Sequence, residues 1–175
     1  MTETDQTPLL ILQNWFSPAF PIGAFSYSSG LETAIHRGDV DGRASLASWL
    51  TISMLHGTAF TDAVFLRAAI ADEDVNDLCL ALCAGAERHR ETTELGAAFI
   101  SVMRQTQAIT LPSGLAYPVA IGMAARQLNL QPQPVLAAFV QAVCMNQISV
   151  AVRTVPIGQI DGQSCLLSLA PVIQQ

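Results

Sequence analysis

Apolar residues recur at steps of three and four along most of the chain, a spacing typical of helices with one buried face. Leu and Ala dominate, the alternation typical of strands is scarce, and Pro or Gly separates the periodic stretches. The pattern predicts an all-α fold for residues 1–175, a single-domain helical bundle of about seven to ten helices. The expected helices span residues 9–16, 26–37, 43–71, 74–90, 92–109, 117–129, 133–152 and 159–170.

The ends of two expected helices carry typical capping residues. Ser26 is expected to be the N-cap of a helix that Gly38 closes as its C-cap. Asp41 is expected to cap the long helix that follows, with a bend near Gly57. Gly30 falls inside an expected helix, where glycine costs about 1 kcal/mol relative to alanine. We therefore expect another backbone to approach closely at Gly30.

Charge is distributed unevenly along the chain. Residues 1–94 contain 13 acidic residues and five Arg, whereas residues 95–175 contain three Arg and the single acid Asp161. A surface so poor in charge is covered either by the rest of the protein, as inner helices, or by a partner. The second half of the chain is therefore a candidate contact surface.

The composition excludes several classes of protein. All eight basic residues are Arg, so a phosphate loop of the Gly-Lys-Ser/Thr type and a Schiff-base lysine are absent. No two glycines form Gly-x-Gly, which excludes the dinucleotide fingerprint. A net charge of −6 argues against nucleic acid as the main partner. No convergent catalytic set is found, and Gly-x-Ser-x-Gly does not occur. We expect a protein that is not an enzyme.

The chain shows no signal for export or for a membrane. Residues 1–8 are polar and acidic, unlike a signal peptide. The two long uncharged stretches, 105–125 and 127–152, contain Pro, Gly or several amide side chains, so neither is expected to span a bilayer. The four cysteines form no Cys-x-x-Cys pair and are expected to be reduced core thiols. These features predict a cytoplasmic protein without membrane contact.

One group of side chains could begin a metal site. Cys79 and Cys83 stand four residues apart on an expected helix, and Glu87 follows one turn later. The alternative is a buried helix face, because free cysteines are among the most buried residues. The three histidines, at positions 36, 56 and 89, lie on different segments and form no ligand pair. No resident metal is expected.

Three segments are not explained by composition. Residues 17–32 form a Pro- and Gly-rich loop that leads into a helix and can present Phe20, Ile22 and Phe25 in fixed positions. Residues 88–95 form the second segment. Residues 149–163 place Arg153 and Asp161, with two Gln, around a helix break in uncharged surroundings. This third segment is either a structural Arg–Asp pair or a polar patch that faces a partner.

These segments resemble the motifs of the UreF family of urease accessory proteins. Ser-Pro-Ala-Phe-Pro-Ile-Gly-Ala-Phe-Ser-Tyr-Ser-Ser-Gly-Leu-Glu at 17–32 is similar to the family's N-terminal signature, and Arg-Glu-Thr-Thr-Glu-Leu at 90–95 to its central element. Tyr-Pro-Val-Ala-Ile-Gly at 117–122 and Val-Arg-Thr-Val-Pro-Ile-Gly-Gln-Ile-Asp-Gly-Gln at 152–163 resemble its later elements. The four motifs occur in the family's order and span most of the chain.

The resemblance implies an all-α, non-enzymatic scaffold that forms a homodimer. Such proteins bind the accessory protein UreD (also called UreH) and recruit the GTPase UreG to urease apoprotein, where nickel and a carbamylated lysine complete the active site. GTP would be bound by UreG, and nickel would pass between the partners, so no cofactor is expected to stay on this chain. The expected partner-binding residues are Pro21, Gly23, Phe25, Ser26, Tyr27, Gly30 and Glu32 in one region and Arg153, Gln159, Asp161 and Gln163 in another.

The sequence departs from the family pattern at two places. Gly96 follows Glu-Leu where the family often continues with Arg. Family members also usually run on through a further helix and an Arg/aromatic tail, whereas this chain ends at Gln175. Two other hypotheses stay open: a small helical nickel-binding protein or enzyme that uses Cys79, Cys83 and a His, and a helical interaction module with different partners.

Overall fold

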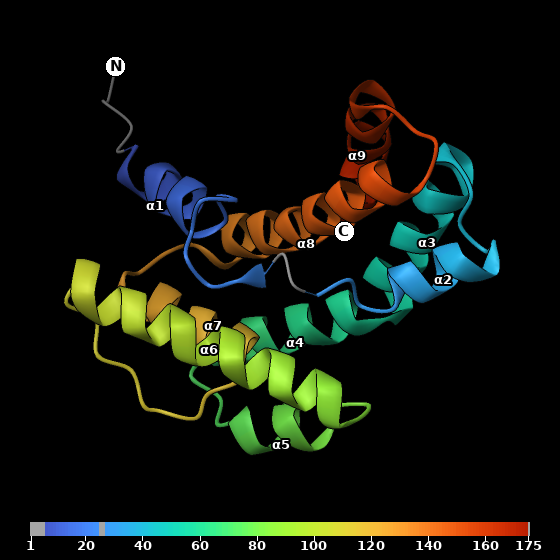
Figure 1. Ribbon diagram of the computed structural model, residues 1–175. Helices are drawn as coiled ribbons and strands as arrows, with labels where there is room; N and C mark the ends of the chain where they lie inside the picture. The colour runs from blue at the N-terminus through green and yellow to red at the C-terminus, as the bar shows by residue number, and fades with distance from the viewer. Residues whose placement is uncertain (1–5, 25–26, 175) are drawn as a thin grey trace. The chain divides into compact units, whose positions relative to one another are not determined.

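The computed structural model describes residues 6–24 and 27–174, and this part of the chain contains helices and turns but no strand, which confirms the all-α prediction. Figure 1 shows the helices in chain order. They are α1 (Thr7–Trp15), α2 (Leu31–Arg37), α3 (Arg43–His56), α4 (Thr58–Ile70), α5 (Asn76–Ala81), α6 (Ala86–Thr106), α7 (Tyr117–Gln127), α8 (Pro132–Thr154) and α9 (Gln159–Ile173).

The expected helix over residues 43–71 is divided at Gly57 into α3 and α4. A Cβ at Gly57 would lie 3.0 Å from the carbonyl oxygen of Ser53, so a glycine permits this tight junction. At the start of α3 the N-cap is Gly42 rather than Asp41. Asp41 contributes indirectly, because its Oδ1 accepts a hydrogen bond of 2.8 Å from the Ser45 hydroxyl, which itself accepts the N–H of Gly42.

The predicted boundary between the helices over 74–90 and 92–109 is wrong. α5 is a short helix that ends at Ala81, and α6 begins at Ala86, directly after the extended backbone of Gly85. The sequence pattern predicts one continuous helix over 74–90 because Leu78 and Leu82, four residues apart, are typical of a buried face. In the structure these two side chains are 56% and 60% exposed, so they do not form a buried face.

The predicted start of α2 is also wrong, and so is the reason given for Gly30. The helix begins at Leu31, and Gly30 is its N-cap with a φ of +84°, a left-handed conformation that glycine adopts without strain. No atom lies within 4 Å of a Cβ built on Gly30, so no close approach occurs there. Ser26, the expected N-cap, lies outside the described residues. Gly38 closes the helix with a φ of +80°, as predicted.

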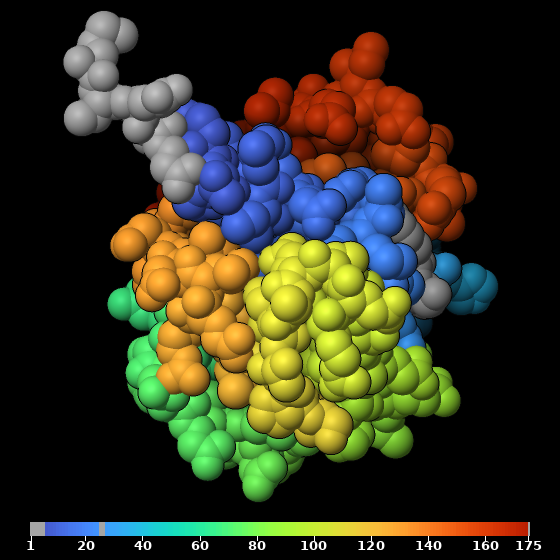
Figure 2. All heavy atoms as spheres, turned by 90° about the vertical axis from the view of Figure 1, so that its left-hand side faces the viewer, coloured from blue at the N-terminus to red at the C-terminus, as the bar shows by residue number. Residues whose placement is uncertain are grey.

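Contacts divide the chain into two units, and each is described by itself. The first unit comprises Met1–Gly23 and Val64–Phe139, and the second comprises Ala24–Ala63 and Val140–Gln175. In the first unit α6 packs against α7, and Figure 2 shows the surface of α6 in yellow-green. In the second unit α3 packs against α9.

The first unit depends on a close contact between α6 and the start of α7. A Cβ at Gly96 would lie 2.1 Å from the carbonyl oxygen of Leu115, so only glycine fits at this position. One turn earlier the fully buried Thr92 accepts a hydrogen bond of 3.1 Å from the N–H of Tyr117, the first residue of α7. Asn76 completes the junction by accepting the N–H of Ala116 at 2.9 Å. The side chains of Thr92 and Asn76 therefore satisfy backbone groups where α7 begins.

Aromatic rings fill the core of the same unit. Trp15 at the end of α1 meets Phe99 of α6 edge to face, with ring centroids 5.3 Å apart. Phe99 also contacts Phe20 and Tyr117, and Tyr117 in turn contacts Phe139. These contacts attach α1 and the loop after it to α6, α7 and the first half of α8.

The core of the second unit lies among α2, α3, α8 and α9. Gly162 of α9 is buried, and a Cβ on it would come within 2.9 Å of the Cγ2 of Ile148 on α8. On α8 the side chain of Gln147 is only 2% exposed, and its Oε1 accepts a hydrogen bond of 3.0 Å from the Trp49 indole on α3. A buried amide with a partner fixes the rotation of α8 against α3.

In the described part of the chain, α8 is the one helix long and apolar enough to cross a membrane, by length and composition alone. The prediction that residues 127–152 could not do so was too strict, because it gave too much weight to Pro and amide side chains. Core helices of soluble proteins can be equally long and apolar. In α8, 39% of the apolar stretch is buried inside the structure. Hydrogen bonds of Asn146 and Gln147 to other segments show that α8 packs within protein.

The contact at Gly96 generates a test of stability. Replacing a helical Gly by Ala normally stabilises a helix by about 1 kcal/mol. Here the new methyl group would collide with the carbonyl oxygen of Leu115, so we expect Gly96→Ala to lower the free energy of unfolding by about 1–3 kcal/mol. Urea denaturation followed by circular dichroism measures the change. As a control, Ala97→Gln on the exposed side of α6 should stay within about 0.5 kcal/mol of the parent. A stabilised Gly96→Ala variant would refute the close contact.

Candidate partner-binding surfaces

The first part of the predicted N-terminal contact region belongs to the first unit. Pro21 and Gly23 are exposed, and Gly23 has a φ of +75°, which a side chain would strain. Phe20 was expected to be presented to a partner, but it is buried against Phe99 with ring centroids 5.9 Å apart. The loop thus uses its first aromatic ring as an anchor, and Pro21 and Gly23 as its exposed part.

The second part of this region belongs to the second unit and is held by a residue that sequence reasoning did not single out. The side-chain amide of Asn146 on α8 donates hydrogen bonds to the carbonyl oxygens of Ala24, at 3.0 Å, and of Tyr27, at 3.1 Å. Phe25 and Ser26, between these two residues, lie outside the described residues. A polar amide within the uncharged stretch 127–152 was the available signal, but the sequence could not show what this amide binds.

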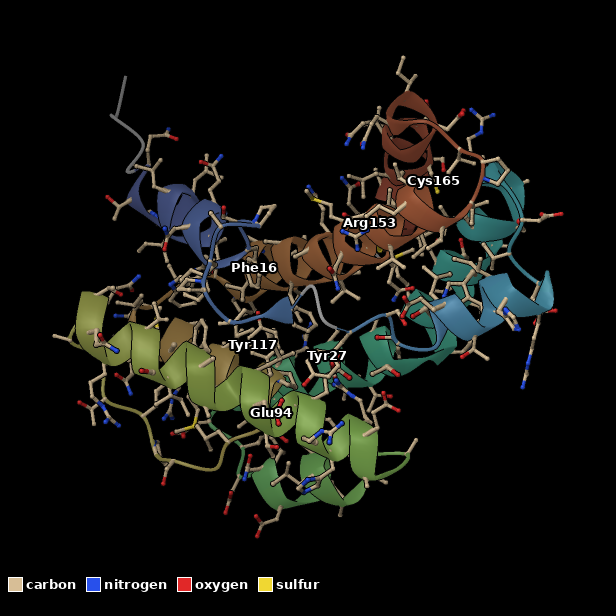
Figure 3. The ribbon with its side chains drawn as sticks, in the orientation of Figure 1. Phe16, Tyr27, Glu94, Tyr117, Arg153 and Cys165 are labelled. Carbon is tan, nitrogen blue, oxygen red and sulfur yellow. The ribbon has the colours of Figure 1, made fainter. Side chains whose placement is uncertain are left out.

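Tyr27, Gly30 and Glu32 surround the start of α2. Tyr27 is half-buried, whereas Gly30 and Glu32 are exposed. Glu32 lies in the first turn of α2, where the helix dipole favours a negative charge. Figure 3 shows Tyr27 in the segment that leads into this helix. The structure therefore leaves Gly30 and Glu32 accessible beside a backbone that Asn146 fixes.

The structural Arg–Asp pair proposed for residues 149–163 is not formed. Arg153 is exposed near the end of α8 (Figure 3). Within the described residues its side chain makes neither an ion pair nor a hydrogen bond. Asp161 pairs instead with Arg43 of α3, whose Nη1 lies 3.7 Å from its Oδ1. The sequence suggested an Arg153–Asp161 pair because Asp161 is the only acid in residues 95–175. It gave no sign that Arg43, from an earlier helix, lies closer.

The outer face of α9 is uncharged and partly apolar. Gln159 and Gln163 are exposed and stand four residues apart, so they share this side of the helix, whereas Asp161 points to Arg43 on another side. Two large apolar side chains lie near the two Gln, Ile160 at 83% and Leu167 at 74% exposure. Exposed apolar side chains next to amides are typical of surfaces that bind other proteins.

Residues 95–175 are poor in charge, which has two possible explanations: inner helices and a surface that binds a partner. Most residues of α7 are buried, so its lack of charge reflects an inner helix. The uncharged residues of α9, in contrast, include exposed apolar side chains. Only α9 therefore supports the interpretation as a contact surface.

The element at 90–95 has a structural side and an exposed side. Thr92 and Leu95 are buried, and Thr92 accepts the N–H of Tyr117. Arg90 and Glu94 are exposed on α6, and Figure 3 labels Glu94. Gly96, which follows where the family often has Arg, is required by the contact with Leu115.

The structure does not bring Cys79, Cys83 and Glu87 together as a group of three metal ligands. Glu87 lies on α6, separated from Cys79 of α5 by the break at Gly85. The Cys83 thiol donates a hydrogen bond of 3.6 Å to the carbonyl oxygen of Cys79, as a structural thiol does. Among the residues described, no group of three or more His, Cys, Asp or Glu side chains lies close enough to hold a metal ion.

Two other thiols are buried in the second unit. Burial and the nearby Cys165 raise the pKa of Cys144 from 9.0 to about 12. Burial also raises the pKa of Cys165, while the charge of Arg43 opposes this shift. Both thiols are therefore protonated at neutral pH in the folded protein.

The described residues define an all-α protein whose candidate sites are exposed contact surfaces on the loop before α2 and on α9. Comparison with known proteins places it in a family. Residues 40–170 match the UreF family. A urease accessory protein UreF from Rhodopseudomonas palustris (strain HaA2) is 44% identical over 179 residues, which cover 93% of this chain and 76% of that protein. The chain belongs to the UreF family.

Other relatives agree. A urease accessory protein UreF from Bradyrhizobium sp. (strain BTAi1) is 40% identical over 189 residues, covering 99% of this chain and 79% of the relative. One from Cereibacter sphaeroides (strain KD131) is 44% identical over 170 residues, covering 95% and 80%. The family resemblance read from the four motifs is thereby confirmed.

The hydrogen bonds of Asn146 generate a second test. In Asn146→Ala the carbonyl oxygens of Ala24 and Tyr27 lose their donor, so we expect the free energy of unfolding to fall by about 1–3 kcal/mol. Hydrogen exchange should also speed up around Tyr27, and mass spectrometry of the corresponding peptide measures it. Gln141→Ala is the control, because Gln141 is exposed on the same helix. Equal exchange in both variants would show that Asn146 does not hold this segment.

The buried thiols generate a prediction for alkaline pH. Because the folded pKa of Cys144 is raised from 9.0 to about 12, the native state keeps a proton that the unfolded state loses. Its contribution to stability is therefore complete below pH 9 and is lost as pH rises toward 12. The chain contains no Lys, so few other groups titrate in this range. We expect Cys144→Val to show a smaller loss of unfolding free energy between these pH values. Identical slopes in parent and variant would contradict the raised pKa.

Proposed function

We propose that this protein is a non-enzymatic scaffold for urease maturation. In this role it binds UreD (UreH), recruits the GTPase UreG and presents this assembly to urease apoprotein. UreG binds and hydrolyses GTP, and hydrolysis is coupled to the insertion of nickel, which passes between partners without a resident site on this chain. The observation that carries the proposal is membership in the UreF family, whose members are named urease accessory proteins.

Two surfaces are proposed to make the contacts. The first lies along the segment before α2: Pro21 and Gly23 belong to the first unit, and Phe25, Ser26, Tyr27, Gly30 and Glu32 belong to the second. It is supported by the exposure of Gly30 and Glu32 and by the hydrogen bonds of Asn146, which hold the backbone of this segment. A segment that is fixed before binding loses less conformational entropy when a partner binds.

The second surface comprises Arg153, Gln159, Asp161 and Gln163. Arg153 is exposed and has no partner within the described residues, so its charge is available for an acidic group. Gln159 and Gln163 can donate and accept hydrogen bonds beside the exposed Ile160. Asp161 contributes less directly, because Arg43 already binds it.

The test combines complex formation with urease activation. The full chain is mixed with UreD and GTP-loaded UreG, and size-exclusion chromatography with light scattering measures the mass of the complex. We expect a ternary complex that contains two copies of this chain, in keeping with a cytoplasmic homodimer. Arg153→Ala should weaken the complex by about 1 kcal/mol or more, because one charged contact is lost. Urease activity in cells that express the variant should fall in parallel.

Controls separate a contact role from a folding role. Gln141→Ala on α8 should leave both the complex and urease activation unchanged, and circular dichroism should show parental helix content for Arg153→Ala and Tyr27→Ala. Loss of helix in either variant would indicate a structural role instead. A chain that never joins UreD or UreG, although folded, would refute the scaffold proposal.

A further inference from the structure

The core of the second unit contains three sulfur-containing side chains, and the proposed scaffold role uses none of them. Met54 of α3, Cys144 of α8 and Cys165 of α9 belong to one cluster of buried side chains, and each is more than nine-tenths buried. The Cys144 Sγ lies 3.4 Å from the Met54 Sδ. A thiol and a thioether are therefore already in direct contact.

A contact between α8 and α9 lies close in sequence to both thiols. A Cβ on Gly162 of α9 would lie 2.9 Å from the Cγ2 of Ile148 on α8. Gly162 lies one turn before Cys165, and Ile148 lies one turn after Cys144. Both thiols are thus within one helical turn of the same helix contact. Their proximity also shows in their acidity, since Cys165 contributes to the raised pKa of Cys144. Figure 3 labels Cys165 on α9.

A positive charge borders this cluster at the surface. Arg43 lies near enough to Cys165 to oppose the upward shift of its pKa. The same guanidinium pairs with Asp161 at 3.7 Å, and both side chains are about half exposed. Ion pairs of this kind contribute little to stability, about 0–1 kcal/mol, so this pair leaves the Arg43 guanidinium free to rearrange.

The ligand chemistry selects one class of metal ion. Two thiolates and a thioether are soft ligands that favour Cu(I), whereas harder divalent ions prefer imidazole or carboxylate groups. A cuprous ion would bind the Cys144 and Cys165 sulfurs and the Met54 sulfur, and two thiol protons would pass to solvent. The bound centre then carries one net negative charge, which the guanidinium of Arg43 partly balances.

We propose that Met54, Cys144 and Cys165 form a binding site for one monovalent soft metal ion, Cu(I), in the core of the second unit. Occupancy joins α3, α8 and α9 through a single ion and therefore stabilises the folded chain. The site is separate from the nickel that the urease assembly handles.

The experiment uses the full chain with Cys83→Ala, which removes the only other neighbouring pair of thiols, Cys79 and Cys83. Cu(I) is supplied without oxygen as its bicinchoninate complex, and loss of the visible absorbance of that complex reports transfer to the protein. We expect one Cu(I) per chain, release of two protons per ion and a higher Tm with Cu(I) than without.

Substitutions then locate the site. Met54→Leu keeps the side-chain volume, so the chain should fold, and Cu(I) affinity should fall by at least the roughly 10-fold to 100-fold typical of losing an outer-shell contact. Cys144→Ala and Cys165→Ala should each abolish binding and the rise in Tm. Met103→Leu is the matched control, because Met103 is fully buried in the first unit. It should bind Cu(I) like the parent.

Three outcomes would overturn the proposal. Folded protein that takes no Cu(I) from bicinchoninate would show that the sulfurs serve core packing only. Unchanged affinity in Met54→Leu and Cys144→Ala would place any Cu(I) elsewhere. Equal or tighter binding of Ni²⁺ or Zn²⁺ at the same residues would refute the assignment to a monovalent soft ion.

Discussion

Close helix packing at glycines is the constraint on which both units depend. A Cβ at Gly96 would lie 2.1 Å from a carbonyl oxygen before α7, and one at Gly122 would lie 2.6 Å from a carbonyl oxygen of α4. In the second unit a Cβ at Gly162 would instead meet a side chain, the Cγ2 of Ile148 at 2.9 Å. Because the helices approach so closely, short polar side chains such as Thr92 reach backbone groups of the next helix.

Much of the helix pattern could be predicted because its signals are local. Prolines in the first turn marked the starts of α7 and α8, and Pro156 and Gly158 marked the break before α9. The observed bounds of these helices lie close to those expected. The break at Gly85 could not be predicted, since the exposure of Leu78 and Leu82 depends on what the rest of the fold places beside them. The role of Gly30 was misread for a related reason. Its positive φ belongs to the turn before α2, and the sequence pattern had extended the helix through it.

The candidate surfaces show the same limit. Motifs identified the segments at 17–32, 90–95 and 152–163, and hence the family, because motif order is a property of the sequence. Which side chains bind one another within the fold is not a property of motif order. Asp161 binds Arg43, and Asn146 binds the backbone at Ala24 and Tyr27, through contacts between residues far apart in sequence. Such pairs become visible only once the helices are packed. Buried and exposed positions within one motif, such as Thr92 and Glu94, also separate only at that stage.

The outer face of α9 has a consequence for how associations of this protein respond to salt. Ile160, Leu167, Gln159 and Gln163 carry no charge, so dissolved ions have nothing to screen at that face. Exclusion of water from the apolar side chains would hold a partner there, and ionic strength would have little influence on its affinity. Binding through the isolated guanidinium of Arg153 would instead weaken as salt increases, first through a slower rate of association. One chain thus offers a salt-insensitive face and a salt-sensitive point of contact.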